Sequence, residues 1–131
     1  HVSLRPSHTV SNREEHLLSV LRVAAEAQSQ LESALRPLDL TVDGWRVLMT
    51  IRAAPGASMA EVIEALVIPA TSATRVVDAL VDLGAVFRTP APEDRRRVTL
   101  RLSAEGLRRL RRAQDVIRAI EPPDLGSPLP D

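Results

Sequence analysis

The stretch PEDRRRVTLRLSAEG, residues 92–106, decides the fold. Three consecutive arginines, Arg95, Arg96 and Arg97, follow an acidic pair and precede a segment in which apolar and polar residues alternate. Alternation with a period of two predicts a β-strand over residues 97–102. The three arginines then lie where the loop meets the strand, either as a solvated run of charge or as a tip that contacts an anion.

The residues before this strand predict a hairpin. Residues 85–89, AVFRT, have the composition of a strand, and residues 90–96 hold two prolines together with the charges, so they cannot be a strand throughout. The inward face of the second strand is predicted to carry Val98, Leu100 and Leu102, and the outward face Arg97, Thr99 and Arg101.

Two short helices joined by a tight turn are predicted directly before the hairpin. Ser58 and Glu61 form a capping-box pattern at the start of a helix over residues 58–66, and an apolar periodic segment covers residues 71–83. Gly84 is placed to end the second helix in the left-handed conformation. A helix-turn-helix followed by a charged hairpin predicts a winged helix.

Longer helices flank this unit. The first begins at the capping pattern of Ser11 and Glu14 and ends before Pro37. This is long for a helix of a single small domain, so part of its apolar stripe is expected to face a partner chain. The last helix begins near Ser103 and continues to about Ile120. The predicted fold is mainly α, with a small β-hairpin wing and long N- and C-terminal helices.

Composition limits the class of protein. A chain of 131 residues with one Trp and one Phe must fill a single core with Leu, Val, Ile and Ala, which favours helices. The sequence has no Cys, which excludes disulfides, zinc–thiolate sites and thiol redox switches. No apolar run approaches the roughly 18 residues of a membrane span. We therefore expect a cytoplasmic protein without a membrane partner.

The positive charge is concentrated in one segment. The net charge is zero, yet residues 88–112 contain nine Arg and only three acidic residues. This local concentration of positive charge produces an electrostatic field that attracts a polyanion such as a nucleic acid. Every basic residue other than His is Arg and none is Lys. Arginine suits bidentate contacts with phosphates and bases, although a codon bias of the genome gives the same composition.

The second helix of a helix-turn-helix normally enters the major groove of DNA with its N-terminal residues toward the bases. Here those residues are Thr71, Ser72, Thr74 and Arg75. The hydroxyl side chains allow close approach to DNA, and Arg75 is the residue able to make a bidentate contact with guanine, worth about 1–3 kcal/mol of discrimination. Alternatively, Thr71 or Ser72 caps the helix and Arg75 is solvated.

An arginine at a hairpin tip can enter the minor groove, where a narrow A·T tract concentrates negative potential. Arg95 and Arg96 are candidates, and Asp94 is expected to hold an arginine fork by a paired hydrogen bond. Arg97 and Arg101, on the outward face of the strand, are expected to contact phosphates, which position a protein on DNA without specifying sequence.

From about Leu40 to Leu110, the chain resembles the MarR family of bacterial winged-helix regulators. Three stretches carry the resemblance: LTVDGWRVLMTI at 40–51, TSATRVVDALVDLGAV at 71–86 and DRRRVTLRLSAEG at 94–106. The last is the most specific, with Asp94 and Arg96 as an Asp-X-Arg pair.

This resemblance implies a transcriptional regulator, expected to be a repressor, that binds a palindromic operator as a homodimer. The helix over 71–83 would occupy the major groove and the wing over 88–101 the minor groove. The resemblance also implies that a small effector, often aromatic or phenolic, binds between the dimerisation and DNA-binding parts and releases the DNA. The operator sequence, the effector and the sign of regulation do not follow from the sequence.

The resemblance also suggests a division of the chain. Residues 11–40 and 103–121 form the expected dimerisation region, and residues 41–102 the DNA-binding region. Residues 1–10 are expected to be disordered or a remnant of expression, and residues 122–131 a Pro-rich disordered tail. Family members usually continue the last long helix into a further helix of the dimer interface, so the Pro-rich tail puts the family dimer in question.

No enzyme, metal site or cofactor is expected. His1, His8 and His16 lack partners at the spacing of a metal site or a catalytic pair, and the isolated glycines form no phosphate-binding loop. The alternative function is a winged-helix module that binds proteins and has lost DNA binding. Strong salt dependence of DNA binding would separate the two, because phosphate contacts release counterions.

Overall fold

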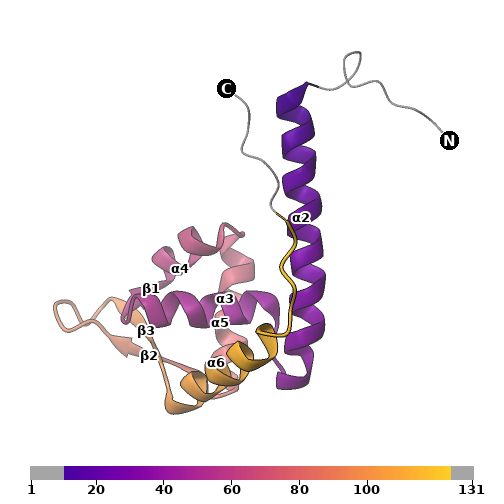
Figure 1. The fold of residues 1–131 in the computed structure, drawn as a ribbon. Coiled ribbons are helices and arrows are strands. Elements are labelled where there is room, and N and C mark those ends of the chain that lie inside the picture. The colour runs from indigo at the N-terminus through magenta and orange to yellow at the C-terminus, as the bar shows by residue number, and fades with distance from the viewer. Residues whose placement is uncertain (1–10, 125–131) are drawn as a thin grey trace.

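The computed structural model describes residues 11–124, so residues 1–10 and most of the predicted tail lie outside the described residues (Figure 1). The described chain is mainly helical with a small antiparallel sheet, which confirms the predicted fold class. Its elements are α2 (Asn12–Leu35), the 3-10 helix η1 (Arg36–Leu38), α3 (Val42–Ala53), β1 (Ala57–Ser58), α4 (Met59–Leu66), α5 (Ala70–Asp82), β2 (Val86–Pro90), β3 (Val98–Leu102) and α6 (Ala104–Ile117). None of the helices within residues 11–124 is long and apolar enough to cross a membrane.

Hydroxyl side chains begin four of the five α-helices that lie within residues 11–124. Each accepts a hydrogen bond from the main-chain N–H three residues later and so satisfies one of the free donors of the first turn. The four N-caps are Ser11, Thr41, Ser58 and Ser103. At α4, Glu61 also accepts from the main-chain N–H of Ser58 (3.4 Å), which completes the predicted capping box.

The sheet has three strands in the order β1-β3-β2. β2 and β3 form the predicted hairpin, with Val86 opposite Leu102 and Pro90 opposite Val98. The sequence did not predict β1, whose residue Ala57 pairs with Leu100. Two residues are too few to show an alternating pattern, yet they join the base of the hairpin to the start of α4.

The predicted faces of β3 are partly wrong. Thr99, expected to point outward, is only 6% exposed, and Val98, expected inward, is 47% exposed. β3 is the central strand, and the Thr99 hydroxyl donates a hydrogen bond of 3.0 Å to the Thr89 carbonyl. Val98 lies at the end of the hairpin, opposite Pro90 and next to the tip. Leu100 is fully buried, as predicted.

The core lies between the sheet, the helix-turn-helix and α6. Its largest fully buried side chains come from α2, α3, α4, β3 and α6. They include Leu35, Leu48, Ile51, Leu66, Leu100 and Leu110. The C-terminal part of α2 contributes to this core, whereas its N-terminal half extends away from the rest of the molecule (Figure 1). Four large apolar side chains of that half are exposed: Leu17, Leu18, Val20 and Leu21.

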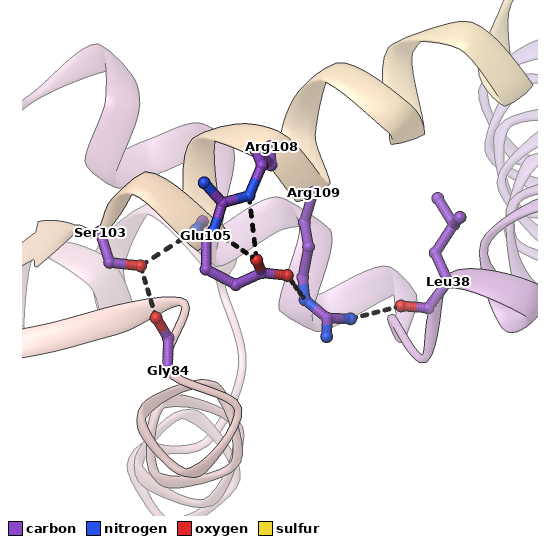
Figure 2. A network of polar contacts seen from close by, with 7 residues as sticks. Leu38, Gly84, Ser103, Glu105, Arg108 and Arg109 are labelled. Atoms are coloured by element: carbon purple, nitrogen blue, oxygen red, sulfur yellow. Dashed lines mark hydrogen bonds and ion pairs between the residues drawn. The ribbon is translucent and has the colours of Figure 1, made fainter.

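A polar network fixes the start of α6 (Figure 2). The Ser103 hydroxyl caps α6 and donates to the carbonyl of Gly84, at the end of α5. The carboxylate of Glu105 binds Arg108 at 2.9 Å and Arg109 at 3.1 Å. The hydrogen bond from Arg108 is the main cause that lowers the pKa of Glu105 below its ordinary value, with the charges of both arginines adding to it.

The last helix is shorter than predicted. α6 ends at Ile117, three residues before the expected end, and the chain then continues alongside α2 without helix or strand through Asp124 (Figure 1). Gln30 of α2 donates a hydrogen bond of 3.2 Å to the carbonyl of Glu121 in this segment. The two prolines that follow Glu121 have no N–H to continue a helix.

Candidate nucleic-acid interface

The first two turns of α5 carry the predicted contacts of the recognition helix. Thr71, Thr74 and Arg75 are exposed and Ser72 is half-buried. The Thr74 hydroxyl donates 2.9 Å to the carbonyl of Ala70, so its oxygen remains able to accept. Arg75 has no hydrogen bond or ion pair within residues 11–124, which leaves its guanidinium available to a ligand.

The alternative role of Thr71 and Ser72 as helix caps is wrong. α5 begins at Ala70, and its N-cap is Pro69, which makes no side-chain hydrogen bond to the first turn. The proline ring holds φ near the observed −57°, which leads the chain into the helix without a polar cap. The hydroxyl groups of the first turn are therefore not used in capping.

The turn before α5 contains a strained residue that the sequence did not predict. Val67 ends α4 with φ at 55°, in the left-handed region that β-branched residues disfavour, and the residue is 85% exposed. Arg46 of α3 supports this turn by donating 2.8 Å to the carbonyl of Leu66. A helix-turn-helix signal in the sequence indicates a turn here but not which residue takes the strained conformation.

Asp94 organises the tip of the wing. Its Oδ1 accepts from the main-chain N–H of Arg96 (3.1 Å) and from Arg96 Nε (3.3 Å). Asp94 therefore holds an arginine, as expected, but through Arg96 Nε and the main chain and not through a paired hydrogen bond to the guanidinium fork. The outer edge of the guanidinium is left free, and the Arg96 side chain is 92% exposed. Arg95, next to it, is exposed and has no polar partner within the described residues.

Arg97 and Arg101 lie along β3 below the tip. The carbonyl of Arg97 accepts from Ala91 N (2.9 Å) and closes the loop, while its guanidinium lies 3.8 Å from the Glu93 carboxylate. Arg101 is exposed, and its guanidinium lies over the turn at Gly56, where an added Cβ would be 3.2 Å from Nη2. Both side chains are on the surface of the wing, as the alternating pattern predicted.

The predicted residues form two groups on separate elements. One group lies on α5 and the other on the wing, and no hydrogen bond or ion pair between residues 11 and 124 joins them directly. A different pair connects the two elements: Arg88 of β2 donates from Nη2 to Oδ1 of Asp78 in α5. The pair was not predicted from the sequence, although an acidic residue at Asp78, on the exposed face of α5, indicated that a partner was needed there.

We found no candidate metal site among the described residues. No group of three or more His, Cys, Asp or Glu side chains between residues 11 and 124 could hold a metal ion. The exposed arginines, with the hydroxyl groups of α5, form a surface that can bind phosphates and base edges.

Comparisons with known proteins agree with this geometry. Residues 38–97 match the model of the MarR family. The chain is 31% identical over 100 residues to the HTH-type transcriptional repressor Rv2887 of Mycobacterium tuberculosis, covering 76% of this chain and 72% of that protein. It is 29% identical over 99 residues to the repressor IacR of Pseudomonas putida, covering 76% of this chain. The chain spans only 59% of the length of IacR.

Solved structures have the same fold. A point mutant of MarR from Escherichia coli, in complex with operator DNA, aligns with a TM-score of 0.69 at 28% identity and covers 88% of this chain and 79% of that one. CouR from Rhodococcus jostii RHA1, bound to p-coumaroyl-CoA, aligns with a TM-score of 0.75 at 25% identity, covering 83% and 77% of the two chains. By sequence and by fold, the chain belongs to the MarR family.

Proposed function

We propose that this chain is a sequence-specific DNA-binding transcriptional repressor. α5 enters the major groove, with Thr71, Ser72, Thr74 and Arg75 toward the bases. The wing over residues 88–101 follows the minor groove, with Arg95 and Arg96 at its tip. Arg97 and Arg101 bind phosphates. A solved complex of MarR, a protein with the same fold, with operator DNA supports DNA binding by this fold.

The exposed guanidinium of Arg96 is the observation that carries this proposal. An arginine at a surface tip usually loses conformational freedom when it binds, and this loss weakens the contact. Asp94 reduces the loss because it already holds Nε at 3.3 Å, while the side chain stays 92% exposed. An arginine held in place and open to solvent is suited to insertion into a narrow minor groove.

A homodimer on a palindromic operator is part of the proposal. The N-terminal half of α2 exposes Leu17, Leu18, Val20 and Leu21, a group of large apolar side chains that water disfavours. A second copy of the chain would cover them through residues 11–40 and 103–121, the proposed dimerisation region. Two copies related by a twofold axis would place two α5 helices in adjacent major grooves.

Release by a small effector completes the proposal. CouR, with the same fold, binds p-coumaroyl-CoA. In this chain, a cavity of about 240 Å³ between α3 and α6 is lined by Trp45, Met49, Arg52, Leu110, Gln114 and Ile117. Its apolar walls and single arginine suit a small aromatic acid. Trp45 is the only Trp of the chain, so quenching of its fluorescence would report binding there.

The test is fluorescence anisotropy with a labelled duplex from upstream of the gene that encodes the chain, across a salt series. A scrambled duplex of the same composition measures sequence selectivity. We expect binding that strengthens as salt falls and weakens at least about tenfold in Arg96→Ala, the loss of one well-placed charged contact. Arg36→Ala, at an exposed arginine of η1, removes the same charge outside the wing and serves as the control, provided that sedimentation shows the same oligomeric state as the wild type, because Arg36 lies in the proposed dimerisation region.

Weak binding that ignores sequence and is unchanged by Arg96→Ala would contradict the proposal for that duplex. The winged helix would then serve as a protein-interaction module. The acidic residues Asp78 and Asp82 on the exposed face of α5 are the feature that would favour this second function.

A further inference from the structure

An acidic side chain lies in the middle of the face of α5 that is proposed to meet DNA. An α-helix turns once in about 3.6 residues, so Asp78 lies two turns after Thr71 and on the same side of the helix. Its direction falls between those of Thr74 and Arg75. The Asp78 side chain is 56% exposed. A free carboxylate at this position would repel the phosphates that the neighbouring residues approach.

Arg88 provides the counter-charge from a fixed position. Its main chain lies in β2 opposite Leu100, whose side chain is fully buried in the core. From there its Nη2 donates to Oδ1 of Asp78, and the Arg88 side chain is 40% exposed. The pair therefore links the recognition helix to the wing through two elements that are each held by the core.

The exposed face of α5 carries a second acidic residue, which is not paired within residues 11–124. Asp82 lies one turn after Asp78 on the same face, is exposed and has no polar partner within the described residues. Asp82 is in the last turn, farther from the N-terminal end that leads into a groove. Of the two acids, the one nearer to the proposed DNA contacts is the one that is paired.

We propose that Arg88 is a positioning residue for DNA binding and that it acts through Asp78. It neutralises the carboxylate on the DNA-facing side of α5. This inference rests on the proposed DNA-binding function. It differs from a direct contact between Arg88 and a phosphate, because the importance of Arg88 then depends on the presence of the Asp78 charge.

A double-mutant cycle separates these two roles. The dissociation constant of the upstream duplex is measured for the wild type, Arg88→Gln, Asp78→Asn and the double variant. We expect Arg88→Gln to weaken binding by about tenfold, because it leaves Asp78 unpaired. Asp78→Asn alone should stay within about threefold of the wild type, and the double variant within about threefold of Asp78→Asn.

The salt series gives a second, independent readout. If Arg88 does not contact phosphate, the double variant keeps the wild-type slope of log K against log salt. A lost phosphate contact would reduce that slope by about 0.9. Asp82→Asn removes the same charge from the same face without breaking a pair, so it shows how much binding gains from charge alone. Far-ultraviolet circular dichroism of each variant confirms that the helices are intact.

The inference is overturned if the double variant binds as weakly as Arg88→Gln and shows the smaller slope, because Arg88 then contacts DNA directly. It is also overturned if Arg88→Gln binds as tightly as the wild type. Absence of any salt-dependent, sequence-selective binding by the wild type is a different result, which contradicts the proposed function itself.

Discussion

The guanidinium of Arg109 donates a hydrogen bond of 2.6 Å to the main-chain carbonyl of Leu38, 71 residues earlier in the chain. The same side chain is held by Glu105 one turn before it on α6. Through this contact, α6 is joined to the end of η1, where the chain passes from the long helix α2 to α3 (Figure 2). Only 15% of the Arg109 side chain is exposed, so water cannot readily replace these partners.

Glu105→Gln tests the electrostatic part of this network. The folded-state pKa of Glu105 is lowered, so its ionised form stabilises the fold above the ordinary pKa, and this contribution is lost as the pH falls through the lowered value. We expect the wild type to be more stable than Glu105→Gln at pH 7 and the difference to shrink as the pH falls below about 4.5. Urea unfolding between pH 7 and pH 3 measures this difference in the free energy of unfolding. Glu64→Gln, at an exposed position of α4, is the control, and a difference independent of pH would contradict the prediction.

Gly106→Ala should destabilise the fold. A Cβ at Gly106 would lie 2.2 Å from the main-chain carbonyl oxygen of Ala85, a distance that requires α6 or the start of β2 to move. Overpacking of this kind costs about 1–3 kcal/mol, and we expect the upper end because the obstacle is main chain. Chemical denaturation measures the change. Ala104→Gly, an exposed position of the same first turn, should cost no more than about 1 kcal/mol, and an equal loss in both variants would show that close packing is not the cause.

Val67→Gly should stabilise the fold by about 0.5–1 kcal/mol. Left-handed backbone costs a residue with a side chain about 1–2 kcal/mol, and the greater chain entropy of glycine in the unfolded state offsets part of the gain. Little packing is lost because Val67 is 85% exposed. The control is Ala65→Gly, in helical backbone of α4, which should be destabilising. A fall in the free energy of unfolding of Val67→Gly would show that the valine makes a contact that outweighs the strain.

Leu21→Arg should favour the monomer. Leu21 is 66% exposed on the free half of α2, where the proposed dimer would bury it. A buried, unpaired charge costs several kcal/mol, enough to dissociate the dimer at micromolar concentration. Sedimentation velocity compares this variant with the wild type and with Ser19→Arg, an exposed position on the opposite side of α2. Equal sedimentation of a dimeric wild type and Leu21→Arg would place the interface elsewhere.

Features determined by neighbouring residues could be predicted from the sequence. The N-caps Ser11, Ser58 and Ser103 depend on contacts within one helical turn, and Gly84 has the predicted left-handed conformation, with φ at 74°. The hairpin followed from its alternating residues and its charged loop. Such signals are short-range, so they do not depend on how the elements pack.

Features set by tertiary packing could not be predicted. Thr99 is buried because β3 is central, and this depends on the two-residue strand β1. The strain at Val67 contradicts the preference of the residue itself. The pairing of Asp78 with Arg88 depends on the angle between α5 and β2, and no sequence pattern predicts that angle. The roles of the predicted DNA-contact residues remain predictions, and the experiments above test them.

The short strand β1 determines which parts of the molecule can move separately. Because Ala57 pairs with Leu100 and Gly56 N donates 3.1 Å to the Leu100 carbonyl, the base of the wing is attached to the residues that begin α4. These main-chain hydrogen bonds hold the wing against α4, the first helix of the helix-turn-helix. In the proposed complex, this attachment would limit changes in the spacing between the major-groove and minor-groove contacts of one copy. An effector that releases DNA would have to change the distance or angle between two copies.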